Sequence, residues 1–409
     1  MLVIGGLTTR CVPVITLSVS PVGGGRRDRY RAAVALRVPH AGWMVVGWWG
    51  RIVSGAMSTS VAIAVITFRR PALLHALLTS LQAQELPAEF DYGIRIVVVD
   101  NDADGSAARV LEEFGEGTPY PIESVVEAEP GIPFARERSV ELCWNDDALI
   151  FVDDDEVAPP GWLASLLRAW EATGADVVTG PVKGNLPDGA PPWNKYSDVH
   201  DSTGRHATGE DLRKAYTNNT LVSRRVYHTV TPGFHPAFRY TGSSDLHFFL
   251  RVHRAGFRIV WCEEAVIFED VPAGRTTLSW LVRRAFRSGS GDTISRLLIR
   301  RGAISYVLVL AYASARVISA IGFALAGLLL GRKSHLLKAV RRFFSGVGSL
   351  AGIVGINHDE YRERHGAERG PDGGEPVPGD LAGGAGAESA PVADQGSVPV
   401  ADPPDARLP

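Results

Sequence analysis

The sequence predicts an α/β fold in which a mostly parallel sheet is covered by helices on both faces. Between about residues 60 and 174, short apolar segments alternate with segments whose apolar residues recur at helical spacing. The apolar segments are continuous, as is typical of strands buried on both faces. With 409 residues and a hydrophobic content of 45%, the chain is long enough for a full core and for two domains.

The expected elements follow one another in regular order. Apolar runs predict strands at 60–68, 94–100, 122–128 and 148–155. Helical spacing predicts helices at 71–84, 106–114, 133–144 and 160–174. In parallel sheets of this kind the ligand lies beyond the carboxyl ends of the strands. The residues that follow these strands are therefore the first candidates for a functional site.

Three of these strand ends are polar. Thr67 is followed by Arg69 and Arg70, the second strand ends in the Asp-Asn-Asp sequence at 100–102, and the fourth ends in three aspartates at 153–155. We expect these side chains to meet at one edge of the sheet, because the carboxyl ends of parallel strands lie together.

The three aspartates lie directly behind the apolar run LIFV. Side chains alternate along an extended chain, so Asp153 and Asp155 are expected to point one way and Asp154 the other. Two carboxylates on one side of a crevice repel each other unless a cation is present. Mg²⁺ or Mn²⁺ commonly binds through one or two carboxylates plus substrate phosphates. The pattern therefore favours a divalent metal site, with a solvated acidic turn as the alternative.

The two ends of the chain differ in composition from its middle. Residues 1–56 combine a Gly-Arg cluster with a Trp-rich patch and are interpreted as an N-terminal extension, either disordered or upstream of a natural start at Met57. The segment 363–409 is rich in Gly, Pro, Ala and acidic residues and is predicted to be disordered. The main domain is expected at 57–301, followed by an apolar and basic helical segment at 302–362.

Charge and cysteine content exclude few functions. The formal net charge is −3, but the residues from Gly366 onward carry eight acidic and two basic side chains, so the tail is acidic and the rest slightly basic. The net charge of the whole chain does not indicate whether the protein binds nucleic acid. We expect no nucleic-acid partner. The three cysteines, Cys11, Cys143 and Cys262, form no paired motif, which suits a reducing compartment and argues against a zinc cluster.

Five motifs occur in order along the chain. They are VITFRRP (65–71), VVVDNDADGS (97–106), EPGIPFARERSVEL (129–142), FVDDDEVAPPGWL (151–163) and YTGSSDLHFFLRVHRAGFRIVW (240–261). Together they resemble the family 2 inverting glycosyltransferases, over about residues 60–291. The resemblance implies the Rossmann-like GT-A fold and transfer of a sugar from a nucleotide-diphosphate sugar to a hydroxyl acceptor. It also implies a place in cell-surface polysaccharide or glycolipid synthesis.

The resemblance implies which residues hold the donor. Thr67, Phe68, Asp100 and Asn101 would hold the base and ribose, although Phe68 could equally belong to the core. Arg136 matches a family arginine near the nucleotide, and a guanidinium is a suitable fork for diphosphate oxygens. For Arg136 a solvent-facing position on its helix is the alternative.

The D-x-D of the fourth motif resembles the family's metal-binding site. It implies that Asp153 and Asp155 bind Mg²⁺ or Mn²⁺, with Asp153 also at the donor. Family members often place a further histidine ligand after a later strand. This chain has VIFEDVP there, so either Glu269 or Asp270 would have to substitute, or the site holds its ion with fewer protein ligands.

Asp245 is the expected catalytic base, because an acceptor hydroxyl needs a positioned group to remove its proton. In the family this aspartate usually follows a glutamate, whereas here it follows Ser244. A role for Asp245 as the N-cap of the next helix is the alternative, and both roles can coexist.

The segment 279–291 resembles the family's Arg-rich lid. Arg284 or Arg287 would then steady the leaving diphosphate. A basic helix that faces water or a membrane is the alternative interpretation.

The stretch 183–219 is expected to face the acceptor, a glycan or a lipid-linked sugar, because aromatic rings can cover a sugar face. Its rings include Trp193, Tyr196, His200 and His206. The spacing of the histidines matches no standard metal-ligand pattern, so they are interpreted as ordinary loop residues.

Residues 303–331 are apolar except for Arg316 near their middle, and a membrane span needs roughly 20 such residues. Basic residues flank the run on both sides, which disfavours a single crossing. The pattern favours a re-entrant or in-plane helical pair on an anionic inner leaflet, with the catalytic domain at the cytoplasmic face of the cell membrane. A buried helical hairpin in a soluble domain is the alternative.

Two other functions also fit parts of the pattern. The sequence from Asp153 to Val157 is compatible with the first motif of haloacid-dehalogenase-like phosphatases, although that motif normally lies at the first strand. The replacement by Ser244 and the missing histidine are compatible with a non-catalytic membrane scaffold that has a degenerate transferase fold. Turnover of a sugar nucleotide would distinguish the transferase from both.

Overall fold

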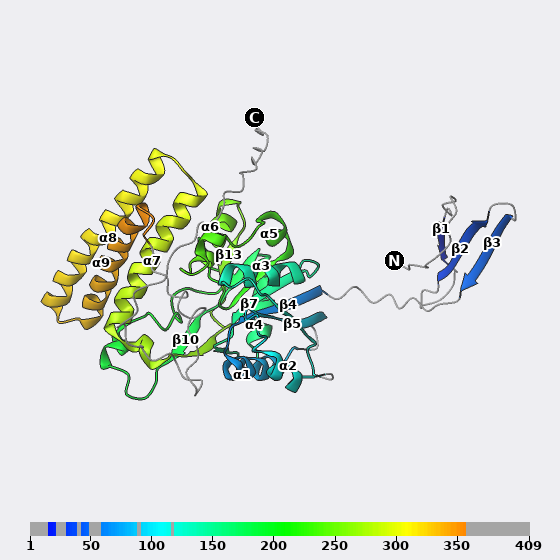
Figure 1. The fold of residues 1–409 in the computed structure, drawn as a ribbon, viewed down its shortest axis with the longest axis horizontal. Helices are drawn as coiled ribbons and strands as arrows, with labels where there is room; N and C mark the ends of the chain where they lie inside the picture. The colour runs from blue at the N-terminus through cyan, green and yellow to red at the C-terminus, as the bar shows by residue number, and fades with distance from the viewer. Residues whose placement is uncertain are drawn as a thin grey trace, which may run out of the picture.

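The computed structural model describes residues 15–21, 30–38, 42–48, 59–87, 91–115 and 118–356 (Figure 1). In the N-terminal segment an antiparallel sheet is formed by β1 (Ile15–Pro21), β2 (Tyr30–Val38) and β3 (Gly42–Trp48). Part of the segment interpreted as an extension therefore has regular backbone structure. Met57 and residues 363–409 lie outside the described residues.

The main sheet has eight strands in the order β11-β13-β9-β12-β7-β4-β5-β6. They are β4 (Thr59–Thr67), β5 (Tyr92–Asp100), β6 (Ile122–Val126), β7 (Ala148–Asp153), β9 (Val177–Thr179), β11 (Asp211–Leu212), β12 (Thr220–Ser223) and β13 (Ile259–Trp261). The neighbours β7, β4, β5 and β6 pair in parallel, whereas β12 is antiparallel to β7 and β9. A small second sheet contains β10 (Val182–Asn185), β14 (Ile267–Asp270) and β8 (Glu156–Val157).

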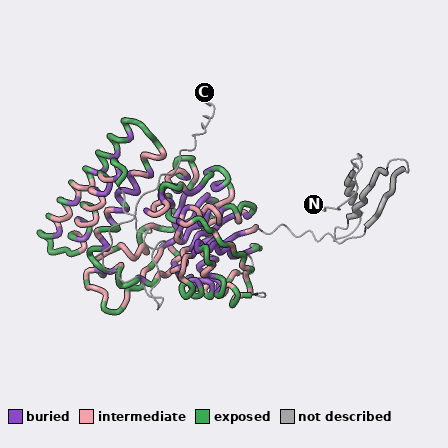
Figure 2. Tube along the Cα trace, viewed as in Figure 1, coloured by how far each residue is buried: buried purple, intermediate pink, exposed green. Residues whose placement is uncertain are grey.

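Helices cover both faces of the main sheet (Figure 1). They are α1 (Pro71–Gln82), α2 (Ala108–Glu113), α3 (Ile132–Leu142), α4 (Trp162–Thr173), α5 (Arg224–Thr229) and α6 (Ser244–Arg254). On β4, Val61, Ile63 and Val65 are buried in the core that includes α1, α2 and α4, while Ala62 and Ala64 are buried in the core that includes α3, α5 and α6. Buried residues are concentrated in the part of the molecule that contains the main sheet (Figure 2). Burial on both faces explains the uninterrupted apolar run. The predicted α/β fold is confirmed.

Parallel pairing aligns the carboxyl ends of β4, β5 and β7. Thr67 is in register with Asp100, and Ile66 is in register with Asp153. The polar strand ends that the sequence predicted therefore lie along one edge of the sheet.

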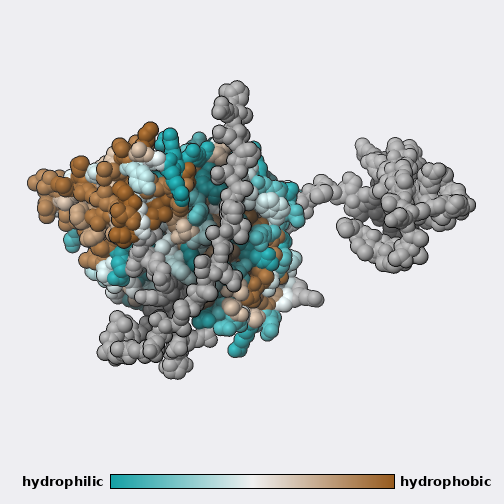
Figure 3. Space-filling model, turned by 45° about the horizontal axis from the view of Figure 1, so that its top comes forward, coloured by the Kyte–Doolittle hydropathy of each residue, from teal (hydrophilic) through white to brown (hydrophobic). Residues whose placement is uncertain are grey.

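Three long helices, α7 (Leu278–Ile299), α8 (Ala303–Leu330) and α9 (Lys333–Ile353), lie side by side at one end of the molecule (Figure 1). Within the described residues, only α8 is long and apolar enough to cross a membrane, and only 17% of its most apolar stretch is buried. Its exposed large apolar residues include Ile304, Val307, Leu308, Ile318, Ile321, Leu325, Leu328 and Leu329. Much of this end of the molecule is coloured hydrophobic in Figure 3.

Arg316, the charged residue in the middle of α8, faces the neighbouring helices. Its Nη1 donates to the Ser349 hydroxyl of α9 at 3.1 Å, and its Nη2 lies 3.7 Å from Asp292 Oδ2 of α7. The guanidinium also lies over the Tyr312 ring. The apolar outer face of α8 is thus continuous past its only charged residue.

Glycines let α7 and α9 approach closely. A Cβ atom at Gly348 of α9 would lie 2.0 Å from the Phe286 carbonyl oxygen of α7, and one at Gly289 of α7 would lie 1.9 Å from the Ser345 carbonyl oxygen of α9. The domain boundary predicted after residue 301 falls between α7 and α8, although α7 packs along α9. That boundary stays a prediction.

We expect Gly348→Ala to destabilise the helical bundle by about 1–3 kcal/mol, because its methyl group would collide with backbone that has no room to move. Gly322→Ala on α8 is the matched control, since nothing lies within 4 Å of its Cβ position. The control should be neutral or stabilising by up to about 1 kcal/mol, because alanine favours helix. Thermal unfolding of the two purified variants checks this. Equal stability of the two variants would contradict the close approach.

Candidate active site

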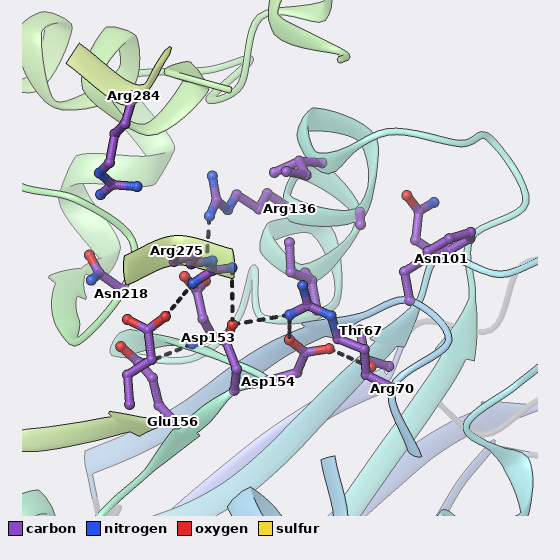
Figure 4. Close-up of a pocket in the computed structure, with 16 residues that line it drawn as sticks. Thr67, Arg70, Asn101, Arg136, Asp153, Asp154, Glu156, Asn218, Arg275 and Arg284 are labelled. Carbon is purple, nitrogen blue, oxygen red and sulfur yellow. Dashed lines mark hydrogen bonds and ion pairs between the residues drawn. The ribbon is translucent and has the colours of Figure 1, made fainter. Parts of the chain in front are cut away.

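A cavity of about 230 Å³ lies at the carboxyl ends of β4, β5 and β7 (Figure 4). Its charged lining residues are Arg70, Arg136, Asp153, Asp154, Asp155, Glu156, Glu269, Arg275 and Arg284. Thr67, Phe68, Asn101 and Asn218 are among the other residues that line it. Five carboxylates and four guanidinium groups thus share one small space.

The acidic cluster is a turn and not a continued strand. β7 ends at Asp153, and the chain bends before β8 begins at Glu156. All three aspartates consequently line the cavity, and the expectation that Asp154 points away is wrong. Asp154 accepts a hydrogen bond from the Thr67 hydroxyl at 2.8 Å. Arg70 Nη1 bridges Asp154 at 2.9 Å and Asp155 at 3.1 Å.

Burial and mutual repulsion disfavour the charged forms of several of these carboxylates. Burial raises the pKa of Asp153, and the nearby Asp155 and Asp245 raise it further, while Arg136 opposes the shift. The side chain of Asp153 is 37% exposed, and because it lines the cavity, this exposed surface faces the cavity. Burial also raises the pKa of Glu269 and of Glu156, with Asp153 adding to the shift of Glu156. A cation in the cavity would relieve this repulsion.

The Asp154 carboxylate has a pKa raised to about 6. Burial is the largest cause, and the Asp155 charge adds to it, while Arg70 and the Thr67 hydroxyl lower the pKa. Arg70 therefore holds two like charges together at the tip of β7.

Arg136 connects three parts of the cavity. It is only 8% exposed, so the solvent-facing alternative does not hold. Its Nη1 donates to the Ser244 hydroxyl at 3.2 Å, and its Nη2 lies 3.5 Å from Asp153 Oδ1. The guanidinium also lies over the Phe234 ring. Ser244, which stands where the family usually has a glutamate, is thus a buried partner of Arg136.

Asp245 is the second residue of α6 and follows Ser244, the hydrogen-bond partner of Arg136. Ser243 is the N-cap residue, and Asp245 Oδ1 accepts a hydrogen bond from the Leu246 amide at 2.8 Å. The alternative that Asp245 is the N-cap residue is therefore wrong. Asp245 lies in the first turn of α6, where a carboxylate interacts favourably with the helix dipole. Asp245 is half-buried and does not line the cavity, but its charge acts on Asp153.

Of the residues predicted to hold the base and ribose, Thr67, Phe68 and Asn101 line the cavity, and Asp100 does not. Phe68 is partly exposed and is not a plain core residue. Asp100 accepts hydrogen bonds from the amides of Asp102 and Ala107, and so shapes the loop after β5.

Asn101 joins that loop to the segment before α3. Its Nδ2 donates to the carbonyl oxygens of Glu127 and Glu129, and its Oδ1 accepts from the Gly131 amide.

The two proposed lid arginines occupy different places. Arg284 lines the cavity, whereas Arg287 is buried in α7 and does not line it. Of the two possible further metal ligands, Glu269 lines the cavity, and Asp270 instead accepts a hydrogen bond from Asn185. Sequence reasoning missed Arg275, which pairs with Glu269 and lies 3.7 Å from Asp155.

The aromatic residues of the expected acceptor stretch have separate environments. Trp193 and Tyr196 belong to one 3₁₀ turn, Pro192–Tyr196. His200 stacks on Trp280 of α7, and burial lowers its pKa to about 4. His206 Nδ1 lies 2.7 Å from Glu210.

Comparisons with known proteins agree with this arrangement. The model of the glycosyl transferase family 2 matches residues 62–231. The succinoglycan biosynthesis protein ExoM of Rhizobium meliloti (strain 1021) is 36% identical over 241 residues, which cover 59% of this chain and 76% of that protein. The glucosyl-dolichyl phosphate glucuronosyltransferase of Haloferax volcanii is 25% identical over 258 residues, covering 59% and 78%.

Two solved structures are remotely similar. TarS of S. aureus is 13% identical with a TM-score of 0.41, covering 69% of this chain and 54% of that chain. GalNAc-T7 with UDP, GalNAc and Mn²⁺ is 13% identical with a TM-score of 0.42, covering 62% and 54%.

An α/β sheet with a charged cavity at its strand ends, in a chain that matches the family 2 model and the succinoglycan biosynthesis protein, defines a glycosyltransferase. The chain belongs to glycosyl transferase family 2. The family predicted from the five motifs is confirmed, and with it glycosyl transfer as the function. The phosphatase alternative is wrong, because Asp153 ends β7, which is the fourth strand of the parallel set along the chain, and lies in a family 2 domain.

We expect Arg136→Lys to lower turnover of the donor by about 10-fold or more, because lysine keeps the charge but cannot reach Ser244 and Asp153 with one planar fork. Arg138→Lys on the same helix is the control, since Arg138 pairs with Glu141 away from the cavity. Release of nucleotide diphosphate from the sugar nucleotide measures both. Equal rates of nucleotide diphosphate release in the two variants would show that Arg136 does not act in the active site.

Proposed function

We propose that this protein is an inverting, metal-dependent glycosyltransferase of cell-surface polysaccharide or glycolipid synthesis. Its donor is a nucleotide-diphosphate sugar, and its acceptor is a hydroxyl of a glycan or of a lipid-linked sugar. The observation that carries the proposal is the cavity where Asp153 and Asp155 meet Arg70, Arg136 and Arg275. The names of the succinoglycan and glucosyl-dolichyl phosphate relatives support the class of product.

The donor is held by groups on opposite sides of the cavity. Thr67, Phe68 and Asn101 on the β4 and β5 side are suited to the base and ribose, as the family resemblance implies. Arg136 and Arg284 come from α3 and α7 and are suited to the diphosphate, because guanidinium groups pair with phosphate oxygens through two parallel hydrogen bonds.

The carboxylates of this cavity fit a hard divalent cation. Their pKa values are raised by burial and by one another, and carboxylate oxygens are the ligands that Mg²⁺ and Mn²⁺ prefer. Among the residues that the structure describes, no three His, Cys, Asp or Glu side chains are arranged to hold an ion. Asp153 and Asp155 would thus hold Mg²⁺ or Mn²⁺ together with donor phosphates, as is common for Mg²⁺. The bound ion would neutralise charge on the departing diphosphate.

Asp245 is suited to act as the base at the other side of the sugar. The acceptor hydroxyl gives its proton to the Asp245 carboxylate, and its oxygen forms a bond to the anomeric carbon as the bond from that carbon to the diphosphate oxygen breaks. Attack and departure take place on opposite faces of the ring, so the configuration inverts. The arginines stabilise the negative charge that develops on the leaving group.

The membrane is the expected location, with the catalytic domain in the cytoplasm. Support comes from the exposed apolar face of α8 and from the inward position of Arg316, which leaves that face uncharged. Basic residues at both ends of α8 favour a helix that lies in or re-enters an anionic inner leaflet. We do not expect the protein to bind nucleic acid.

We expect a panel of nucleotide-diphosphate sugars to raise the unfolding temperature only for the true donor, and only with Mg²⁺ or Mn²⁺. A ligand at 100 times its Kd stabilises the folded state by about 2.7 kcal/mol. Asp155→Ala should abolish the shift, and the matched control Asp270→Ala should keep it, because Asp270 lies outside the cavity. A full shift in Asp155→Ala would contradict the proposed metal site.

We expect Asp245→Asn to lower turnover by about 100-fold or more while donor binding is kept, because asparagine cannot accept the proton. Asp211→Asn is the control, since Asp211 pairs with Arg258 on the surface. Normal turnover in Asp245→Asn would place the base elsewhere. Metal-dependent donor binding by the unaltered protein without turnover on any acceptor would support a non-catalytic scaffold.

A further inference from the structure

A second cavity, of about 640 Å³, lies among the three C-terminal helices and the loop at Asp198. Five of its lining residues are cationic: Arg284, Arg316, Lys338, Arg341 and Arg342. We refer to it as the basic cavity. The sequence gives no motif for it, because these residues are spread over α7, α8 and α9 and meet only when the helices pack.

The positive charge of the basic cavity is only partly neutralised. Asp198, its one acidic lining residue, pairs with Arg341. Asp292 lies outside the lining and is shared between Arg296 at 3.1 Å and Arg316 at 3.7 Å. Within the lining, five cations less the one carboxylate leave a net charge of +4.

Two of these cations contact neutral groups. Arg342 donates to the Ser319 hydroxyl at 3.0 Å and lies over the Phe323 ring. Arg284 lies over the Trp280 ring. Neither contact removes charge, so each guanidinium keeps donors for an anion.

The position of the basic cavity narrows the kind of anion. Arg284 lines both this cavity and the active-site cavity, so the two are neighbours. Tyr312, Arg316 and Phe323 of α8 also line the basic cavity. The outer face of the same helix exposes Ile318, Ile321 and Leu325. A ligand suited to all three places has an anionic group for the basic cavity, a hydrocarbon chain for the apolar face of α8 and a sugar for the active site.

We propose that the basic cavity binds the phosphate or diphosphate group that joins a lipid-linked acceptor sugar to its hydrocarbon chain. The hydrocarbon lies toward the apolar face of α8, and the sugar extends past Arg284 into the active site. The inference rests on the proposed function and specifies the acceptor left open there. One relative's name includes a dolichyl phosphate, which is a compound of this class.

Binding of farnesyl diphosphate and of farnesol to the full chain in a neutral detergent tests the proposal. Isothermal titration should show that the diphosphate binds more tightly than the alcohol by about 10-fold or more, because charge-assisted hydrogen bonds are lost without the phosphates. The double variant Lys338→Gln with Arg342→Gln should remove most of that difference. Equal affinity for the two probes would overturn the proposal.

Matched variants locate the effect. Arg301→Gln with Arg332→Gln removes the same charge from exposed positions outside both cavities and should leave farnesyl diphosphate binding unchanged. Asp155→Ala should also leave it unchanged, because the donor binds in the other cavity. An equal loss of farnesyl diphosphate affinity in the control double variant would mean that binding depends on general charge attraction, and this result would overturn the proposal.

Further outcomes distinguish this proposal from binding of bulk anionic lipid and from failure of the proposed transfer reaction. Displacement of farnesyl diphosphate by phosphatidylglycerol dissolved in the same detergent, but not by phosphatidylcholine, would assign the cavity to bulk anionic lipid and overturn the acceptor assignment. Unchanged farnesyl diphosphate binding in the Lys338→Gln, Arg342→Gln variant, with a normal thermal shift from the donor, would reject the basic cavity alone. Absence of any donor shift in the unaltered protein would instead reject the proposed transfer reaction.

Discussion

The ion pairs of Arg70 with Asp154 and Asp155 hold together a concentration of negative charge that the fold would otherwise oppose. The parallel register of β4 with β7 makes the contact possible, because it sets Thr67, at the end of β4, beside the turn that follows Asp153, and Arg70 comes three residues later. Removing one partner of a buried pair leaves an uncompensated charge, which is strongly destabilising. The cavity, its electrostatics and its suitability for a cation all depend on this contact.

The sequence predicted the sheet well because each strand is buried on both faces and so appears as an unbroken apolar run. It also located the strand ends, and with them Thr67, Asn101 and the aspartates at 153–155. Side-chain alternation failed at Asp154, because a turn interrupts the strand and period-two reasoning holds only within extended chain.

The sequence could not predict contacts between side chains that lie far apart in the chain. Arg275 contacts Asp155 across 120 residues, and Arg136 contacts Ser244 across 108, so no local pattern records either pair. Asp100 stands at a strand end like the site residues but bonds to its own loop instead. The basic cavity is likewise a product of helix packing, which depends on glycines where α7 meets α9.

Arg284 is a single cation in the wall between two cavities. If both cavities bind anions as proposed, the two anions share this guanidinium, and binding in one cavity would change the affinity of the other. Such coupling would be reciprocal: whatever factor the first ligand imposes on the affinity of the second, the second imposes on the first.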